Sequence, residues 1–384
     1  MKEKLFEISF KILKFISSFI PLKNTILFES NPDFADNTLQ VYTEMLKRDL
    51  NKKYKFIWLL NGEKIATKLP ENVSCIKKEQ GSLIEKFFCQ WENLRAKYIV
   101  DSNKYVNKYH KNQVRFHLKH GLPMKDASDY TKMIGDLDVL CVPSDYWVDV
   151  CAAEHGIDTS KIKPFGFPRN DILVPSHHKH KTIMWMPTFR QRMQDNTINP
   201  EFDFNAVMPF GLPTILNIEQ LQEINNFFKA NDAYLLIRLH PAQNLSGINL
   251  ADMSNIKICN DDFIKSYNTT LYKILTYTDA LISDYSSVYY DYLLLDKPIA
   301  LATADFEQYK KYNGILAKDY DEFQQNFPAV FIESYKDLLK FFEDIITDNP
   351  DAYRCSEAKE KYMSGCNNHS AEKIVDYMIA NYNL

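Results

Sequence analysis

Short apolar runs alternate with helical patterns along most of this chain, and this alternation restricts the folds open to it. The expected strands are residues 25–28, 55–60, 73–76, 97–100, 114–118 and 139–142, and then 182–186, 234–239, 256–259, 280–283 and 298–302. The expected helices between and after them are residues 38–50, 83–94, 146–155, 219–229, 271–277, 288–295, 335–347 and 371–382. Strands that alternate with helices favour parallel sheets covered on both faces. The predicted fold class is therefore α/β.

A chain of 384 residues is too long for one ordinary hydrophobic core and suits two domains. The polar segment 175–181 lacks periodicity and separates the two series of strands as a predicted linker. We expect one doubly wound domain over residues 23–175 and another over residues 182–365. Residues 366–384 are expected to form a helix that can cross back to the first domain. Residues 190–216 have an irregular pattern and predict a loop over the cleft between the domains.

Composition and motifs exclude several classes of protein. The net charge of −4 gives no reason to expect nucleic acid as a partner. The seven cysteines are odd in number and form no C-x-x-C pair, which indicates reduced thiols in a cytosolic protein. Asp136 and Asp138 precede a strand, and His177, His178 and His180 lie in the polar linker, so we predict no metal site. Neither a G-x-x-x-x-G-K-[ST] loop nor a G-x-G-x-x-G turn is present, which argues against ATP hydrolysis and dinucleotide binding.

The first 22 residues predict an amphipathic helix with a basic character. Apolar residues recur at helical spacing, and the first 20 residues hold four lysines against two glutamates. No cleavage site of a secretory signal is visible, and no apolar run is long enough to span a bilayer. Such a helix either lies in the interface of an anionic membrane or packs on its own domain. We favour the first interpretation, which predicts a peripheral protein on the cytoplasmic face of the membrane.

The stretch from residue 281 to residue 298 carries the most functional information. It indicates a buried strand, a polar turn and an amphipathic helix, with Asp284, Ser286 and Ser287 where the strand gives way to the helix. A helix N-terminus has unpaired N–H groups and a partial positive charge, and it readily binds phosphate. Asp291 lies four residues after Ser287, on the same helix face. It is either an acceptor for a ribose or polyol hydroxyl or a solvated helix residue.

A second polar pair ends the strand at residues 234–239. Arg238 and His240 alternate with an apolar residue, so both side chains point to the same side. Burial of both without an anion would be costly. In an open α/β sheet the carboxyl ends of the strands face one crevice. These residues and the turn at Asp284 therefore predict a site for a phosphorylated ligand, such as a nucleotide diphosphate.

Other candidates lie after the strand at residues 114–118 and in the segment 166–171 that precedes the linker. His120 comes directly after a strand, and Gly121 lets the backbone turn there. A histidine can accept the proton of an attacking hydroxyl near neutral pH, although a histidine at a strand end can also be structural. We interpret His117 as a strand residue only. Arg169 can bind phosphate with two parallel hydrogen bonds or lie in an exposed turn.

Thr188 and Arg190 offer a hydroxyl and a guanidinium at the exit of the strand at residues 182–186. The alternative is an ordinary surface loop.

Together these segments resemble the CDP-glycerol glycerophosphotransferase family, whose members build teichoic acids and related capsule polymers. The matching segments are residues 27–30 with Asp36 and Asn37, residues 55–60, the run from His120 to Lys125, and residues 166–171, 187–190, 238–241 and 283–298. Two features depart from the family pattern. Lys119 replaces the aromatic residue that commonly precedes the His-Gly pair, and residues 313–328 lack a glycine often found near their end.

The resemblance implies a GT-B architecture, with two Rossmann-like doubly wound domains and an interdomain cleft. It implies transfer of a polyol phosphate, glycerol phosphate first and ribitol phosphate as a variant, from a CDP carrier to an acceptor hydroxyl with release of CMP. It implies catalytic roles for His120, the general base, and for His240. The donor-binding residues that it implies are Gly121, Leu122, Pro123, Met124, Lys125, Arg169, Thr188, Arg190, Arg238, Asp284, Ser286, Ser287 and Asp291.

The expected partners are a CDP-polyol donor, a lipid-linked or polymer acceptor and the cytoplasmic membrane surface. We expect no required cofactor, and no motif indicates Mg²⁺. Two alternatives stay open at this point. One is a nucleotide-sugar enzyme of the same architecture, either a glycosyltransferase or a UDP-sugar epimerase. The other is a membrane scaffold without catalytic activity, which would have lost the motif residues that this chain retains.

Overall fold

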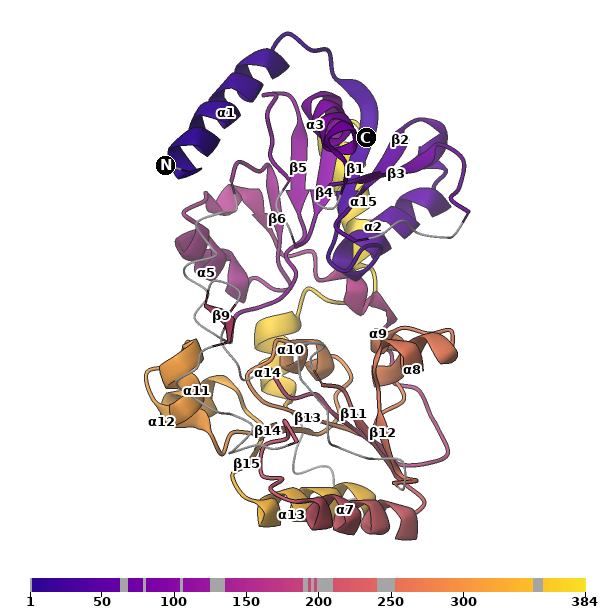
Figure 1. Cartoon of the computed structure of the whole chain (residues 1–384), viewed down its shortest axis with the longest axis vertical. Helices are drawn as coiled ribbons and strands as arrows, with labels where there is room; N and C mark the ends of the chain where they lie inside the picture. The colour runs from indigo at the N-terminus through magenta and orange to yellow at the C-terminus, as the bar shows by residue number, and fades with distance from the viewer. Residues whose placement is uncertain are drawn as a thin grey trace. The chain divides into compact units, whose positions relative to one another are not determined.

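The computed structural model describes residues 2–62, 68–78, 81–103, 106–124, 135–188, 193–194, 197–198, 210–239, 253–347 and 355–384. The chain forms two compact units, both drawn in Figure 1. The first comprises Met1–Gly121, Ser128–Asp171 and Ser364–Leu384, and the second comprises Leu122–Ala127 and Ile172–Met363. The described residues include no helix with the length and apolar character needed to cross a membrane.

The first unit is built on a seven-stranded parallel sheet with the order β3-β2-β1-β4-β5-β6-β7. Its strands are β1 (Lys23–Glu29), β2 (Lys55–Leu60), β3 (Val73–Lys77), β4 (Ala96–Asp101), β5 (Val114–His117), β6 (Val139–Cys141) and β7 (Ile162–Lys163). The central strands consist of unbroken runs of apolar residues, because helices cover both faces of a parallel sheet. Ile26, Leu27 and Phe28 of β1 are all fully buried for this reason.

The helices of the first unit are α1 (Lys2–Ser17), α2 (Asp36–Lys47), α3 (Leu83–Arg95), α5 (Tyr146–His155) and α15 (Ser370–Tyr382), with 3₁₀ turns at Leu50–Lys52, Thr159–Lys161 and Pro168–Ile172. A capping box between Ser82 and Glu85 fixes the start of α3. Ile374 and Met378 of α15 enter the same hydrophobic core as Val41 of α2. The last helix therefore completes the first unit, although the chain reaches it after the second.

The second unit is built on a six-stranded parallel sheet with the order β12-β11-β8-β13-β14-β15. Its strands are β8 (Thr182–Trp185), β11 (Tyr234–Ile237), β12 (Ile256–Ile258), β13 (Ala280–Ser283), β14 (Ile299–Ala302) and β15 (Val330–Ile332). Its helices are α7 (Ile218–Ala230), α8 (Asp261–Ser266), α9 (Leu271–Leu275), α10 (Val288–Leu293), α11 (Phe306–Asn313), α12 (Tyr320–Asn326), α13 (Tyr335–Ile346) and α14 (Ser356–Met363).

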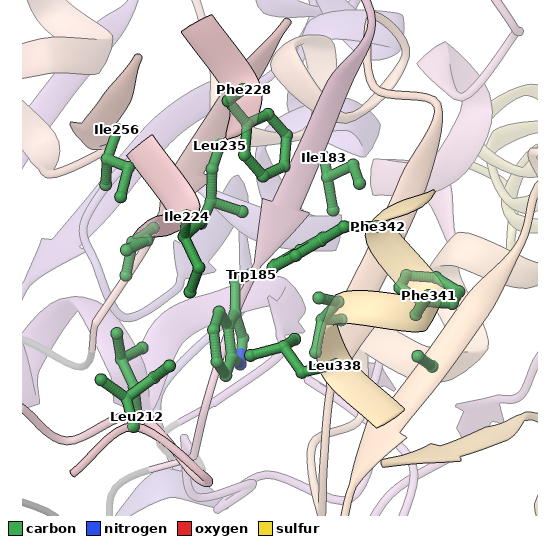
Figure 2. Close-up of a cluster of buried hydrophobic side chains, with 14 of the residues drawn as sticks. Ile183, Trp185, Leu212, Ile224, Phe228, Leu235, Ile256, Leu338, Phe341 and Phe342 are labelled. Atoms are coloured by element: carbon green, nitrogen blue, oxygen red, sulfur yellow. The ribbon is translucent and has the colours of Figure 1, made fainter. Parts of the chain in front are cut away.

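One face of the second sheet packs against α7 and α13 through a dense hydrophobic cluster. Figure 2 shows Trp185 of β8 among side chains from both helices, with Leu338 beside it. The rings of Phe228 and Phe342 meet edge to face with centroids 5.0 Å apart. Aromatic pairs of this kind add to the stabilisation that burial of their apolar surface provides. This core holds β8 and β11, whose carboxyl ends carry several predicted site residues.

Both sheets reverse their strand order beside the first strand, between β1 and β4 in one unit and between β8 and β13 in the other. Ligands of open α/β sheets bind outside the carboxyl ends of the strands at such switch points. The predicted α/β class with two doubly wound sheets is confirmed, and each predicted strand is present. The sequence did not predict β7, β15 or the helices α8, α11, α12 and α14.

Residues 190–216, for which we expected no regular structure, lie partly outside the described residues. The described part contains β9 (Met193–Gln194) and β10 (Thr197–Ile198), which pair antiparallel.

Candidate active site

His120 lies in the first unit, three residues beyond the end of β5. Its Nδ1 atom hydrogen-bonds to Oδ2 of Asp36, which begins α2. The Asp36 side chain is only 5% exposed, whereas that of His120 is 59% exposed. A buried carboxylate therefore holds the inner nitrogen of an imidazole whose ring is open to solvent.

Arg169 ties this pair to the backbone around it. Its Nη1 atom lies 2.9 Å from Oδ1 of Asp36 and also donates to the carbonyl oxygen of His120. Its backbone N–H donates to Oδ1 of Asn37 at 3.0 Å, and the Asn37 side-chain amide donates to the carbonyl of Lys119 at 2.7 Å. Asp36, Asn37 and Arg169 thus fix both the ring of His120 and the turn that presents it.

Electrostatics keep Asp36 in its charged form. Burial alone would raise the pKa of this carboxyl group, but the Arg169 guanidinium and the hydrogen-bonded His120 outweigh burial and lower the pKa below its ordinary value. With Nδ1 bound to a carboxylate, Nε2 is the nitrogen of His120 that can accept a proton from a substrate. A carboxylate hydrogen-bonded to one ring nitrogen also stabilises an imidazolium, and this arrangement is suited to acid–base chemistry.

His117 has a different environment, which agrees with its interpretation as a strand residue. Its ring is buried at the end of β5, and its Nδ1 lies 2.7 Å from Oδ1 of Asp101. Burial lowers the pKa of His117 despite the Asp101 carboxylate, so the ring stays neutral near pH 7. Arg115 completes this buried cluster, with Nη2 at 2.9 Å from Oδ2 of Asp101.

Lys119 sits inside the cluster of described residues that could otherwise hold a metal ion. Ligand atoms of Cys151, Glu154 and His155 lie within 4.8 Å of one another. The Lys119 ammonium lies 3.2 Å from Oε2 of Glu154 and 3.2 Å from Nε2 of His155. A cation already neutralises this group, so the cluster gives no support for a metal there. The contacts with Glu154 and His155 hold Lys119, the residue that precedes His120.

In the second unit, Asp284 joins the loops that follow β8 and β13. The side chain is fully buried and accepts hydrogen bonds from the backbone N–H of Thr188 at 2.9 Å and from the Thr188 hydroxyl. It also accepts from the N–H of Tyr285 at 2.6 Å. Asp284 is therefore placed to position the two loops, and a direct contact with the donor stays a prediction.

Ser286, Ser287 and Asp291 surround the start of α10. Ser287 is the N-cap residue, and its hydroxyl makes no hydrogen bond within the described part of the chain. Asp291 is 1% exposed and accepts from the Tyr272 hydroxyl at 3.1 Å, so the alternative of a solvated helix residue is wrong. Tyr272 belongs to α9 and was not among the predicted site residues, because no local pattern marks it.

Arg238 comes directly after β11, which ends at Ile237 and not at residue 239 as expected, and its guanidinium already makes two contacts. Nη1 donates to the carbonyl of Cys259 at 2.9 Å, and Nη2 lies 2.8 Å from Oδ1 of Asp261. The side chain is 19% exposed, so part of the guanidinium remains open to a ligand. These contacts fix the direction of the guanidinium at the carboxyl end of β11.

The segment that follows Gly121 belongs to the second unit. Leu122 and Met124 are buried in the second unit, where the Pro123 carbonyl accepts from the Tyr290 hydroxyl at 3.1 Å. The Met124 carbonyl accepts from the N–H of Leu316 at 3.2 Å. The chain therefore passes from one unit to the other directly after Gly121.

The predicted residues thus fall into three sets. His120, Gly121 and Arg169 belong to the first unit, and the structure brings His120 and Arg169 together. Leu122, Pro123, Met124, Thr188, Arg238, Asp284, Ser286, Ser287 and Asp291 belong to the second unit. Lys125, Arg190 and His240 lie outside the described residues.

A model of the CDP-glycerol:poly(glycerophosphate) glycerophosphotransferase family matches residues 12–380. The chain belongs to this family. The resemblance seen in the sequence motifs is therefore confirmed over nearly the whole chain. The sequence retains His120, Arg238, His240, Ser286 and Ser287, so the motif loss expected of a scaffold has not occurred.

Two curated relatives show how far the family likeness extends. The chain is 24% identical over 410 residues to the teichoic acid ribitol-phosphate polymerase TarL of Staphylococcus aureus, with 95% of this chain and 64% of TarL covered. It is 23% identical over 424 residues to the teichoic acid poly(glycerol phosphate) polymerase of Bacillus subtilis, with 98% of this chain and 51% of the relative covered. The chain thus spans between half and two thirds of the length of these glycerophosphotransferase relatives.

Solved structures confirm the fold. The wall teichoic acid polymerase TagF matches with a TM-score of 0.70 at 19% identity, over 99% of this chain and 95% of that one. A UDP-N-acetylglucosamine 2-epimerase matches with a TM-score of 0.52 at 11% identity, over 94% of this chain and 96% of that one. The epimerase shares the arrangement of two Rossmann-like domains, but the glycerophosphotransferase family model does not favour the epimerase alternative.

Proposed function

We propose that this protein transfers a polyol phosphate from a CDP-polyol to a hydroxyl group of a teichoic acid or capsule acceptor and releases CMP. The observation that carries the proposal is the Asp36–His120–Arg169 network, which orients an exposed imidazole as a general base. Membership of the glycerophosphotransferase family supports the substrate class. The names of relatives include both ribitol-phosphate and glycerol-phosphate polymerases.

In the proposed reaction, Nε2 of His120 accepts the proton of the acceptor hydroxyl. The hydroxyl oxygen forms a bond to the β-phosphorus of the donor, the bond from that phosphorus to the bridging oxygen breaks, and CMP leaves with the bond electrons. Arg238, Ser286 and Ser287 hold the diphosphate, with His240 as a predicted partner. Phosphoryl transfer depends mainly on positioning and charge stabilisation, so no covalent intermediate with the protein is required.

A panel of donors tests this function directly. The full chain is incubated with membrane extract and, separately, with CDP-glycerol, CDP-ribitol and UDP-N-acetylglucosamine, and released nucleotide and product mass are measured. We expect CMP release and a mass increase of one or more polyol phosphates, with CDP-glycerol as the preferred donor. Turnover of the UDP-sugar without CMP release from either CDP-polyol would contradict the proposal.

The proposed acceptor is lipid-linked or a polymer, and we place the protein at the cytoplasmic membrane face. Exposed apolar side chains on two neighbouring helices of the first unit support this location. This apolar docking face comprises Ile12, Phe15, Ile16 and Phe19 in and after α1 and Leu83, Ile84, Phe87, Phe88 and Trp91 on α3. Lys11, Lys14 and Lys86 are exposed on the same helices. Apolar side chains beside lysines suit the interface of an anionic bilayer.

The double substitution Phe87→Glu and Phe88→Glu is expected to reduce binding to phosphatidylglycerol vesicles at least tenfold. Burial of one aromatic side chain contributes about 1.5–3 kcal/mol, and insertion of a carboxylate is unfavourable near anionic lipid. Co-sedimentation with vesicles measures the bound fraction, and Leu216→Glu in the second unit is the control because its side chain is also exposed. Unchanged sedimentation of the double variant would exclude α3 from the docking face. Removal of residues 1–20 should lower binding in the same way.

A further inference from the structure

A hollow of about 450 Å³ opens on the second unit, between the sheet and its shortest helices. Its floor is formed by Tyr234 and Leu236 of β11, which are half-buried, whereas Leu235 and Ile237 on the other face are fully buried. The helices α8 and α9 beside it have only six and five residues. At about 1.5 Å per residue they are too short to cover β11 and β12 completely. Figure 1 shows the two helices next to these strands.

Aromatic rings line this hollow and remain accessible. Tyr234, Phe263, Tyr267 and Tyr277 all face it, and Tyr267 is 68% exposed. The rings of Phe263 and Tyr267 pack against each other with centroids 4.9 Å apart, which keeps both near the opening. Flat apolar faces with hydroxyl groups at their edges suit a ligand that has both C–H and O–H groups.

The rim of the hollow carries two lysines that form no ion pair with a residue that the structure describes. His178 and His180 are bound to Asp279 and Asp232, at 2.7 Å and 3.0 Å. By contrast, Lys179 and Lys257 are exposed and form no ion pair with any described residue. A second hollow of about 300 Å³ continues beyond His178 and Lys179. Within the described part of the chain, two lysines without an ion-pair partner therefore lie next to aromatic rings, in a chain whose net charge is −4.

This hollow lies along one face of the sheet and reaches the amino-terminal ends of β8 and β11, whereas the predicted donor residues follow the carboxyl ends of these strands. Thr182 and Tyr234 are the first residues of β8 and β11, whereas Thr188 and Arg238 follow their carboxyl ends. Four residues of strand span roughly 13 Å. The hollow is therefore a separate place on the second unit, and none of the predicted catalytic or donor-binding residues lines it.

We propose that this hollow, with Lys179 and Lys257 on its rim, binds a chain of polyol phosphates away from the reacting centre. The inference rests on the proposed function, which supplies such a chain as acceptor or product. Ammonium groups bind phosphodiester oxygens, and tyrosine rings pack against the carbon chain while their hydroxyls bond to those of the polyol. The hollow is within the usual range of ligand sites, about 300–1,000 Å³. Retention of the polymer here keeps it on the protein between successive transfers.

Binding of fluorescently labelled poly(glycerol phosphate), measured by anisotropy without any CDP donor, tests the inference. The double variant Lys179→Glu and Lys257→Glu is expected to bind the polymer at least tenfold more weakly than the wild-type chain, because two attractive charges become repulsive. Tyr267→Ala should weaken binding with little change in its salt dependence. The charge-matched control is Lys336→Glu with Lys340→Glu, since both lysines are exposed on α13, which packs on the other face of the sheet.

The outcomes separate this inference from the proposed function. CMP release with a short acceptor should be the same in the double variant and the wild type, while product length falls. If the control pair weakened polymer binding as much as the double variant, the attraction would be generally electrostatic and the inference would be overturned. The inference would also be overturned if inorganic polyphosphate, which has no hydroxyl groups, bound as tightly as poly(glycerol phosphate). Loss of CMP release from every CDP-polyol would instead refute the function, and the anisotropy result would still decide whether the hollow binds the polymer.

Discussion

Alanine at position 120 is expected to lower the rate of CMP release by about 10²–10⁴-fold, the usual contribution of a positioned general base. The imidazole is 59% exposed and bound through Nδ1 to a buried carboxylate, so the substitution removes the proposed acceptor of the hydroxyl proton. Donor binding should change little, because Arg238, Ser286 and Ser287, which hold the diphosphate in the proposed reaction, belong to the second unit. Single-turnover CMP release and calorimetric titration with CDP-glycerol measure the two effects separately.

His369→Ala is a suitable control for this experiment. Its side chain lies in the first unit and is 61% exposed, close to the value for His120, and it is paired only with the exposed Glu372 among the described residues. We expect wild-type activity from this control. If His120→Ala retained more than about a tenth of the wild-type rate, His120 would not be the base, since even a modest general base contributes about 10²-fold.

The sequence predicted the sheets well because buried parallel strands are unbroken apolar runs. The residues of β2 and of β13 match the expected ranges, and both strands lie inside their sheets. The missed elements lack this signal. The strand β15 has three residues, two of them half-buried at a sheet edge, and α8 has six residues with one buried side chain. Such short elements are determined by their tertiary neighbours rather than by local periodicity.

The candidate site was predicted only in part, for a related reason. Motifs identified His120, because a polar residue after an apolar strand can be recognised locally, and Arg169, because it lies in the segment 166–171 before the predicted linker. The role of Asp36 could not be recognised in this way, since it pairs with a histidine 84 positions away and an arginine 133 positions away. Asn37 and Tyr272 also act through partners distant in sequence. The proposed general base can thus be found from the sequence, whereas the groups that orient its ring require the fold.

Asparagine at position 36 is expected to reduce kcat by about 10²-fold or more while KM changes little, by comparison with carboxylates that orient a catalytic histidine elsewhere. The amide keeps the shape of the carboxyl group but removes the charge that stabilises the imidazolium. Asp36 has a φ of 61°, and asparagine adopts this left-handed conformation readily, so the backbone should be preserved. Steady-state kinetics with CDP-glycerol measures the split between kcat and KM.

The same substitution should change how stability depends on pH. Arg169 and His120 hold the pKa of Asp36 below its ordinary value of 3.8, so its ionisation stabilises the folded state above that pH. This contribution is lost as the pH falls through the lower pKa of the folded state. Asp36→Asn should therefore lower the melting temperature at pH 7, and this difference from the wild type should shrink in acid.

Asp49→Asn gives a matched control for both measurements. Asp49 also has a left-handed backbone, with a φ of 57°, but its side chain is 66% exposed and is paired only with the exposed Lys52 among the described residues. An exposed ion pair contributes about 0–1 kcal/mol, so this variant should retain activity and nearly all stability. Equal kinetics for the Asp36 and Asp49 variants would show that the buried carboxylate does not act through His120. A loss of stability with unchanged kcat would limit Asp36 to a structural role.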